Sequence, residues 1–182
     1  MDLAVKRTLL DASHMQRVMR RMAGEIVERN RGVEGLLLIG IRTRGVPLAE
    51  FLVREIERME GKKPAYGILD ITLYRDDLST IAPQPVVKES RLPDGLEGRR
   101  VVLCDDVLFT GRTIRAALDA LMDYGRPKAV QLAVLIDRGH RELPIHADYV
   151  GETVRTTTSE VIKVRYAATD DGEEDVLLLD RE

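Results

Sequence analysis

Two adjacent carboxylates, Asp105 and Asp106, end an apolar stretch of the sequence. The tetrapeptide TGRT, Thr110–Thr113, begins five positions after the first of them, and helical spacing follows it. This order predicts a strand, a turn and the start of a helix. Carboxylates at a strand end accept hydrogen bonds from ribose hydroxyls, whereas the unpaired N–H groups of a helix start attract phosphate. The segment therefore has the two surfaces that a ribose 5-phosphate needs.

The residues of this turn have separable roles. Thr110 and Thr113 have hydroxyl donors, and Gly111 lets the backbone approach an anion closely or adopt a positive φ. Arg112 either adds positive charge or faces solvent. The two carboxylates would repel a phosphate in direct contact, so we expect them at the other end of the ligand. The alternative is an ordinary buried strand before a capped helix. Under this alternative, the two acids, the TGRT sequence and the strand-turn-helix order would occur together by chance.

Three further segments could contribute polar groups. The glycine-flanked turn Gly40–Gly45, GIRTRG, also follows an apolar strand. Its arginines could bind a second anionic group, or they could be solvated residues of a plain strand-to-helix turn. The aperiodic stretch 75–92 is long for a loop, so it is either a mobile flap or an exposed hairpin tip. His140 could be a base, although a lone loop histidine is more often solvated or structural.

The composition limits the other possibilities. With 182 residues and a net charge of −3, the chain predicts one domain without a global basic field for nucleic acid. Its one cysteine, Cys104, excludes an internal disulfide and is expected to pack in the strand. Neither a membrane-spanning run nor a signal peptide is visible, and we expect a cytoplasmic protein. No Walker A or GxGxxG pattern occurs, which disfavours NTPase and dinucleotide-binding functions.

Helices and strands alternate along the chain, which predicts an α/β fold with a doubly wound, mostly parallel sheet and helices on both faces. Ser13 and Gln16 form a capping box that predicts the start of a helix ending at Asn30. Besides the strand before TGRT and the helix after it, the expected elements are strands at 35–39, 65–73 and 129–136, a helix at about 46–59, and strand-like runs at 160–166 and 176–179. No linker or repeat interrupts them, so residues 1–182 are expected to form one domain.

The run VVLCDDVLFTGRT closely resembles the PRPP-binding signature of type I phosphoribosyltransferases. The resemblance implies their fold, with a core at about 13–137, a flexible flap hairpin at about 72–92, and a small hood from N-terminal residues and about 138–182. It implies that Asp105 and Asp106 hold the ribose of PRPP and are catalytic. Mg²⁺ would be the cofactor, bound mainly through PRPP and water rather than by a protein cage.

The same resemblance assigns the other groups around PRPP. Arg75 of the flap would be catalytic, and Thr43 and Arg44 would hold pyrophosphate on a turn that often contains a non-proline cis peptide. The nucleotide contacts that it implies along the signature are Val107, Leu108, Phe109, Thr110, Gly111, Arg112 and Thr113.

Together with GIRTRG, DITLYRDDL, MDYGRP and LAVLIDRGHRELPI, the signature resembles one branch, the PyrR family of bifunctional pyrimidine-operon attenuators and uracil phosphoribosyltransferases. The resemblance runs from the first helix to about Val164. It implies synthesis of UMP from uracil and PRPP, and binding to the pyr operon messenger RNA leader that depends on UMP or UTP. It also implies a homodimer or larger homo-oligomer. Arg138 and the backbone near Val161 and Ile162 would lie beside the base in the hood.

Charge alone gives a weaker indication of RNA binding. Arg17, Arg20 and Arg21 form a basic N-terminal region, and a second basic cluster contains Arg141. The alternative is a solvated helix face in which Arg21 and Glu25 form an i,i+4 pair, and 4% aromatic residues provide no visible stacking platform.

Three functional hypotheses are therefore open. The first is an enzyme that also regulates. The second is a hypoxanthine or guanine phosphoribosyltransferase without an RNA role, and the third is a catalytically weak sensor of PRPP or nucleotide. Intact acid-pair, TGRT and GIRTRG segments favour an enzyme over a sensor, because a sensor does not need the pyrophosphate turn.

Overall fold

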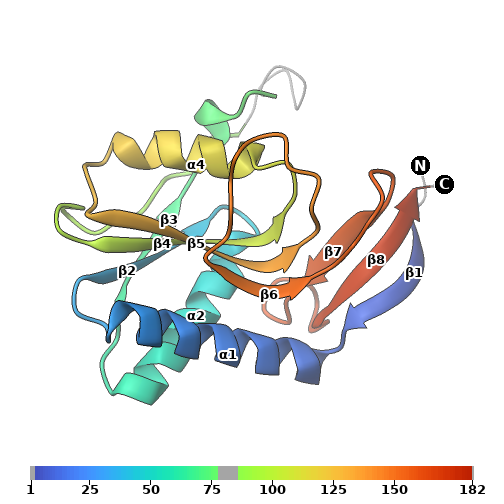
Figure 1. The fold of residues 1–182 in the computed structure, drawn as a ribbon, viewed down its shortest axis with the longest axis horizontal. Helices are drawn as coiled ribbons and strands as arrows, with labels where there is room; N and C mark the ends of the chain where they lie inside the picture. The colour runs from blue at the N-terminus through green and yellow to red at the C-terminus, as the bar shows by residue number, and fades with distance from the viewer. Residues whose placement is uncertain (1–2, 78–85, 182) are drawn as a thin grey trace.

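Five parallel strands form the central sheet in a computed structural model that describes residues 3–77 and 86–181 (Figure 1). In sheet order they are β3 (Ala65–Leu69), β2 (Leu36–Ile41), β4 (Arg100–Leu108), β5 (Ala129–Asp137) and β6 (Tyr149–Thr153). Helices α1 (Ala12–Asn30) and α2 (Gly45–Glu60) cover one face, and α4 (Arg112–Met122) covers the other. The predicted doubly wound parallel sheet with helices on both faces is confirmed.

A second sheet joins the two ends of the chain. Its antiparallel strands are β1 (Leu3–Leu10), β8 (Asp175–Arg181) and β7 (Val161–Arg165), with β8 in the middle. Figure 1 shows this sheet beside the central sheet, with both termini at its outer end. A short 3₁₀ helix, η1 (Thr72–Tyr74), follows β3. We call the three-stranded sheet and the turn between β7 and β8 the hood.

The strands of the central sheet are apolar on both faces, as a covered parallel sheet requires. Successive residues of β2 point to opposite sides, so Leu38 packs with α1 and α2 whereas Leu37 and Ile39 pack in the cluster that contains α4. The first cluster continues into the hood through Ile162 and Val176. The two sheets therefore share one core.

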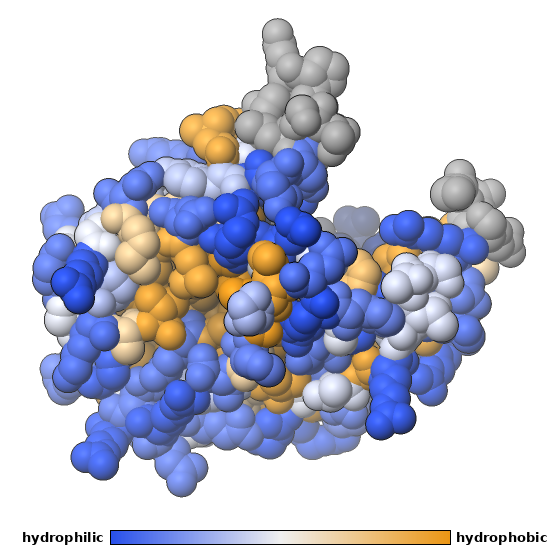
Figure 2. All heavy atoms as spheres, turned by 45° about the horizontal axis from the view of Figure 1, so that its top comes forward, coloured by the Kyte–Doolittle hydropathy of each residue, from blue (hydrophilic) through white to orange (hydrophobic). Residues whose placement is uncertain are grey.

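Charged and polar side chains cover most of the face seen in Figure 2, and apolar side chains gather in its middle. This agrees with a chain in which 32% of residues are charged. Among the described helices, none is long and apolar enough to cross a membrane.

Several predicted boundaries are wrong. Helix α1 is capped by Asp11, whose Oδ1 accepts a hydrogen bond from the N–H of His14 at 2.8 Å. Ser13 lies inside the helix and its hydroxyl accepts a hydrogen bond from Arg17, so the predicted capping box does not form. Strand β3 ends at Leu69 instead of Leu73 because the chain turns into η1.

Two strands have no counterpart in the predicted elements. Most residues of β1 are exposed, so it lacks a continuous apolar face, and β6 has only five residues. Both are stabilised by pairing: β1 with β8 at the other end of the chain, and β6 with the preceding strand β5. The part of the predicted flap at 78–85 lies outside the described residues.

Candidate active site

The acid pair and the GIRTRG turn meet at the carboxyl edge of the central sheet. Asp105 and Asp106 lie near the end of β4, and the turn leaves the end of the neighbouring strand β2. Parallel strands end at one edge, and this edge is where open α/β sheets bind ligands. The peptide bond between Arg42 and Thr43 is cis, as the family resemblance implies for this turn.

Gly45 brings helix α2 directly against β4. A Cβ atom at this position would lie 2.1 Å from the carbonyl oxygen of Cys104 and 3.1 Å from the Cα of Asp105. Only a residue without a side chain fits there. This contact sets the position of the preceding residue, Arg44, relative to the acid pair.

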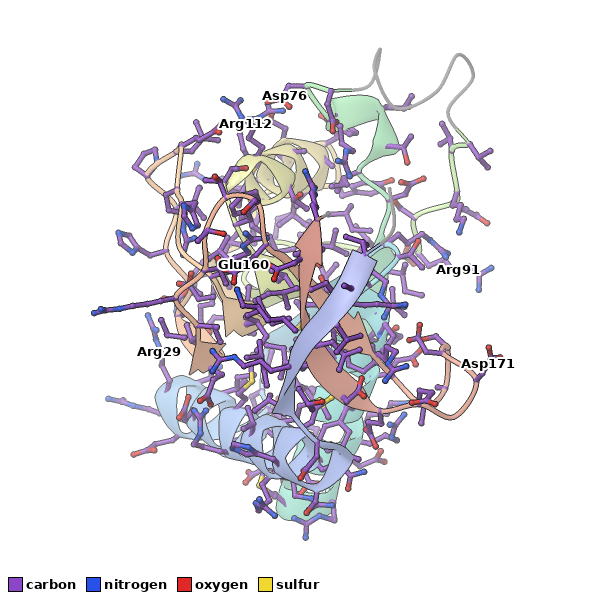
Figure 3. The ribbon with its side chains drawn as sticks, turned by 90° about the vertical axis from the view of Figure 1, so that its right-hand side faces the viewer. Arg29, Asp76, Arg91, Arg112, Glu160 and Asp171 are labelled. Atoms are coloured by element: carbon purple, nitrogen blue, oxygen red, sulfur yellow. The ribbon has the colours of Figure 1, made fainter. Side chains whose placement is uncertain are left out.

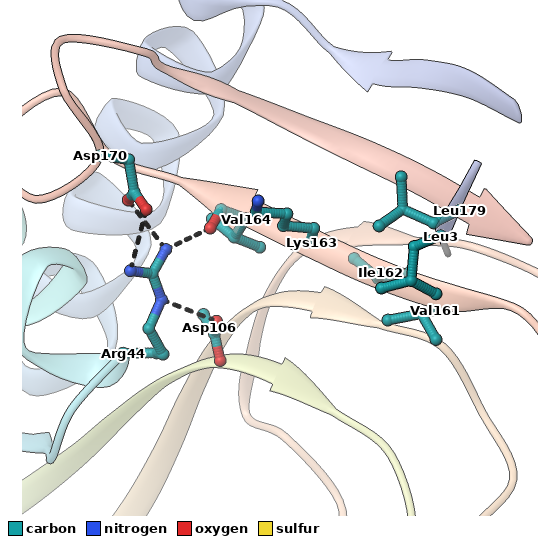
Figure 4. Close-up of a pocket in the computed structure, with 9 residues that line it drawn as sticks. All are labelled: Leu3, Arg44, Asp106, Val161, Ile162, Lys163, Val164, Asp170 and Leu179. Carbon is teal, nitrogen blue, oxygen red and sulfur yellow. Dashed lines mark hydrogen bonds and ion pairs between the residues drawn. The ribbon is translucent and has the colours of Figure 1, made fainter. Parts of the chain in front are cut away.

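The guanidinium group of Arg44 connects the acid pair with the hood (Figure 4). Its Nε lies 3.8 Å from Oδ2 of Asp106, and its two terminal nitrogens donate to the carboxylate of Asp170 at 3.4 and 3.0 Å. It also donates to the carbonyl of Val164 and lies over the ring of Tyr166, 5.6 Å from the centroid.

A cavity of about 400 Å³ opens around these groups between the sheet and the hood. Its lining consists of Leu3, Arg44, Asp106, Val161, Ile162, Lys163, Val164, Asp170 and Leu179. The structure therefore brings together four residues that were predicted for the site: Arg44, Asp106, Val161 and Ile162.

Burial makes the acid pair costly to ionise. The Asp105 residue is only 7% exposed, and burial together with the neighbouring charge of Asp106 raises its pKa well above the usual range. Burial also raises the pKa of Asp106, against the opposing effects of the backbone N–H of Val107 and the charge of Arg44. Hydroxyl donors or a cation at this position would stabilise the charged form.

The TGRT turn has the geometry of an anion-binding helix start. Gly111 has a φ of 93° and precedes the first residue of α4, and Oγ1 of Thr110 accepts a hydrogen bond from the N–H of Arg112 at 3.3 Å. The free N–H groups at this end of α4 can bind a phosphate.

The side chain of Arg112 is partly exposed to solvent, as one of its two predicted alternatives has it, and it also forms two ion pairs. It pairs with Asp76 at 2.7 Å (Figure 3) and with Glu142 at 2.6 Å, and thereby links the segment after η1 and the loop after β5 to α4. Arg75 pairs with Asp77 at 2.9 Å, beside the start of α4. The structure therefore brings Arg75 to the phosphate turn.

Arg138 does not line the cavity with Val161 and Ile162. It is only 6% exposed and donates to the backbone carbonyls of Thr157 and Glu160, each at 2.8 Å. Its guanidinium carbon lies 4.0 Å from the ring centroid of Phe109, and burial lowers its pKa. Arg138 thus connects the signature segment to the chain that leads into β7.

The arginines predicted for RNA form two separate groups. Arg17, Arg20 and Arg21 lie on α1, and the expected pair between Arg21 and Glu25 is confirmed at 2.7 Å. Arg141 pairs with Asp137 at 2.6 Å and donates to nearby carbonyls. Arg141 lies in the loop after β5, away from the helix that carries the other three arginines.

Two residues of the site, Asp170 and Tyr166, were not predicted. The hydroxyl of Tyr166 is buried without a hydrogen-bond partner among the described residues, and burial and the acid pair raise its pKa. The only sequence signal for Asp170 was a cluster of acids between two strand-like runs. The contacts that bring it to Arg44 join residues 126 positions apart.

Comparison with known proteins agrees with this geometry. The phosphoribosyl transferase domain family matches residues 7–169. The chain is 58% identical over 179 residues to "Bifunctional protein PyrR" of Deinococcus deserti, covering 98% of this chain and 97% of that protein. It is 57% identical over 177 residues to the protein of the same name from Thermus thermophilus, with 97% of each chain covered.

The chain belongs to the PyrR family. Its phosphoribosyltransferase fold is also found in more distant proteins, such as a hypoxanthine phosphoribosyltransferase from Staphylococcus aureus. That structure superposes with a TM-score of 0.71 at 17% identity, over 95% of this chain and 92% of the other. At this identity the likeness shows the fold alone, whereas PyrR-family membership extends over almost the whole chain. The predicted family is confirmed.

Proposed function

We propose that this PyrR-family chain transfers the phosphoribosyl group of PRPP to uracil, giving UMP and pyrophosphate. We also propose that it regulates pyrimidine biosynthetic genes by binding the pyr messenger RNA leader in response to uridine nucleotides. The observation that carries both proposals is 58% identity to a bifunctional PyrR protein over 98% of the chain. The meeting of acid pair, GIRTRG turn and TGRT turn at one sheet edge supports the enzymatic part.

Each part of PRPP has a matching group at this edge. Asp105 and Asp106 can accept hydrogen bonds from the ribose hydroxyls, and the N–H groups of Thr110–Thr113 can bind the 5-phosphate. Thr43 and Arg44 are the candidates for pyrophosphate, because the Arg44 guanidinium lies 3.8 Å from Asp106 and faces the same cavity.

The reaction needs charge stabilisation more than a strong base. When the bond from the ribose carbon to pyrophosphate breaks, positive charge develops on the ribose and negative charge on the leaving group. The carboxylates of Asp105 and Asp106 stabilise the first, and Arg44 and Arg75 stabilise the second. Uracil N1 then forms the new bond to the ribose carbon while its proton leaves. Holding uracil and PRPP in line supplies a large further part of the acceleration.

Phosphoribosyltransferases generally use Mg²⁺ with PRPP. No group of three or more His, Cys, Asp or Glu side chains suited to a metal occurs within residues 3–77 and 86–181. Two adjacent carboxylates fit a Mg²⁺ that keeps most of its ligands from substrate oxygens and water. We propose Asp105 and Asp106 as the protein groups nearest this ion, which when bound supplies positive charge that neutralises the leaving pyrophosphate.

The base is proposed to bind against the hood. Val161 and Ile162 line the cavity next to Asp106, and backbone groups there can hydrogen-bond uracil. Arg138 would contribute by fixing Phe109 and the chain before β7, and the signature residues Val107, Leu108 and Phe109 would continue the nucleotide site.

For RNA, the three arginines of α1 are exposed, whereas Arg141 is partly buried and donates to backbone carbonyls of the domain. A cytoplasmic location follows from the proposed messenger RNA ligand. The homodimer or larger homo-oligomer stays a prediction, which light scattering on the purified protein would check.

The proposal is tested in two assays on the same preparation. With PRPP, uracil and Mg²⁺, chromatography should detect UMP and pyrophosphate in equal amounts. A labelled pyr leader RNA should bind more tightly with UMP than without it, and the affinity should fall steeply with salt. Failure to form UMP contradicts the enzymatic part, and RNA affinity unaffected by both UMP and salt contradicts the regulatory part.

A further inference from the structure

Asp170 lies in the turn between β7 and β8, beyond the residues 7–169 that the domain family matches. Its carboxylate accepts four hydrogen bonds: from the backbone N–H of Tyr166 at 2.8 Å, from the hydroxyl of Thr169 at 2.9 Å, and from two nitrogens of Arg44. These donors lower its pKa, against a raising effect of burial. Asp170 is therefore a fixed negative charge.

The contact between Asp170 and Arg44 is bidentate. Nη1 donates to one oxygen of Asp170 at 3.4 Å and Nη2 to the other at 3.0 Å. A planar guanidinium held by both oxygens of one carboxylate has a defined orientation as well as a defined position. The Val164 carbonyl and the Tyr166 ring restrict the same group from the hood side.

This arrangement leaves the Nε–H of Arg44 directed at Asp106 across the cavity. A guanidinium has five N–H groups, and Asp170 and Val164 accept three of them. The Nε–H faces Asp106, but 3.8 Å is too long for a hydrogen bond. The Nε–H thus remains available on the side of the acid pair, where pyrophosphate is proposed to bind, and the other free N–H, on Nη1, lies on the opposite edge of the guanidinium.

We propose that Asp170 is a positioning residue that holds Arg44 ready for the pyrophosphate of PRPP. It acts through Arg44 and does not itself contact the substrate. The inference rests on the proposed function, because it deepens the role given there to Arg44. It assigns a function to the turn between β7 and β8, a segment without a predicted role.

The neighbouring residue Asp171 provides a matched control. It carries the same charge one position along the turn, and Figure 3 shows its side chain directed away from the domain. It has a φ of 54°, a conformation that asparagine tolerates well. Asp171→Asn therefore changes the net charge by the same amount as Asp170→Asn without touching Arg44.

The test compares Asp170→Asn, Asp171→Asn, Arg44→Met and the double variant Arg44→Met with Asp170→Asn. PRPP binding is measured by calorimetry without uracil, and kcat and KM are measured with uracil. Asp170→Asn should weaken PRPP binding about tenfold and should also lower kcat, because a misplaced Arg44 holds pyrophosphate less well both before and during bond cleavage. Asp171→Asn should match the wild type in both assays.

The double variant decides whether the effect passes through Arg44. In the Arg44→Met background, Asp170→Asn should change PRPP affinity less than twofold. An equal tenfold loss in both backgrounds would show that Asp170 acts independently, and tighter binding by Asp170→Asn would show that it restrains Arg44. Either result overturns the inference, as would unchanged binding.

The readouts also separate this inference from the proposed function. A wild-type protein that binds PRPP but forms no UMP contradicts the proposed function, while the binding data still test Asp170. A wild-type protein that binds no PRPP contradicts both. Thermal unfolding of each variant confirms that the fold is retained, since asparagine can still accept the hydrogen bond from Tyr166.

Discussion

Replacing Gly45 by alanine should displace the whole pyrophosphate turn. The new Cβ would lie 2.1 Å from the backbone carbonyl oxygen of Cys104, whereas Cβ atoms in proteins essentially never approach another heavy atom within 3.0 Å. Helix α2 or strand β4 must therefore move by about 1 Å, and neither has free space, because both are packed in the core. The new Cβ clashes with a backbone atom of a central strand, so rotating a side chain cannot relieve the clash.

The cost of this displacement can be estimated. Overpacking a buried position typically costs about 1–3 kcal/mol, and a clash with backbone belongs at the upper end, about 3 kcal/mol. Arg44 would move with the helix start, and a misplacement of about 1 Å can lower kcat/KM for PRPP about 100-fold. Urea unfolding and steady-state kinetics measure the two effects.

Gly24 is the matched control for this substitution. It lies inside helix α1, and a Cβ there would meet no atom within 4 Å. Gly24→Ala should therefore stabilise the protein by about 0.5–1 kcal/mol and leave turnover unchanged. The packing argument is refuted if Gly45→Ala unfolds within about 0.5 kcal/mol of the wild type.

Three other substitutions test the site and its supports. Asp106→Asn should lower kcat on the order of 100-fold without loss of the folded state, because it removes a charge that stabilises the ribose; an unchanged kcat removes Asp106 from the catalytic role. Arg138→Met should destabilise the protein by roughly 2 kcal/mol in urea, because the carbonyl of the buried Glu160 loses its donor, as does that of Thr157; a change below about 0.5 kcal/mol contradicts this. The hydrogen bond from Lys6, and after it that from the N–H of Thr157, lowers the pKa of Glu160 from 4.5 to about 2. The ionised carboxylate therefore stabilises the fold fully above about pH 4.5, and this stabilisation is lost as the pH falls towards 2. The Tm difference between wild type and Glu160→Gln should therefore be present at pH 7 and shrink between about pH 4.5 and 2, and a pH-independent difference counts against the assignment.

The sequence predicted the parts of the site that are local. The acid pair, TGRT and GIRTRG each depend on a few consecutive residues, and the rule that parallel strands end at one edge brings them together. The cis peptide at Arg42–Thr43 was expected from the family resemblance and is present. Sequence patterns that span about ten residues were also enough to predict α2, α4 and β5.

What escaped prediction depends on contacts between distant residues. Strand β1 is a strand because it pairs with β8, from Leu3 opposite Arg181 to Leu10 opposite Val176. The partners of Arg112, Asp76 and Glu142, come from two loops on either side of α4 in the sequence. No spacing rule relates these positions.

The error at Ser13 has a different cause. Asp11 and Ser13 can both cap a helix, and the pattern Ser13–Gln16 favoured the second. The backbone at Asp11 is extended, with φ −80° and ψ 172°, whereas Ser13 is already helical. The sequence alone does not show which of two good capping residues, two positions apart, has the extended backbone that a cap needs.

The most direct test of the central claim is the base specificity of PRPP turnover in Mg²⁺. The wild-type protein should be assayed with uracil, hypoxanthine, guanine and orotate under identical conditions, and kcat/KM compared. A PyrR-family enzyme should form UMP with a kcat/KM for uracil at least about 100-fold above that for any other base. Turnover of hypoxanthine or guanine without turnover of uracil would contradict the proposed function and leave only the fold and the PRPP site in place.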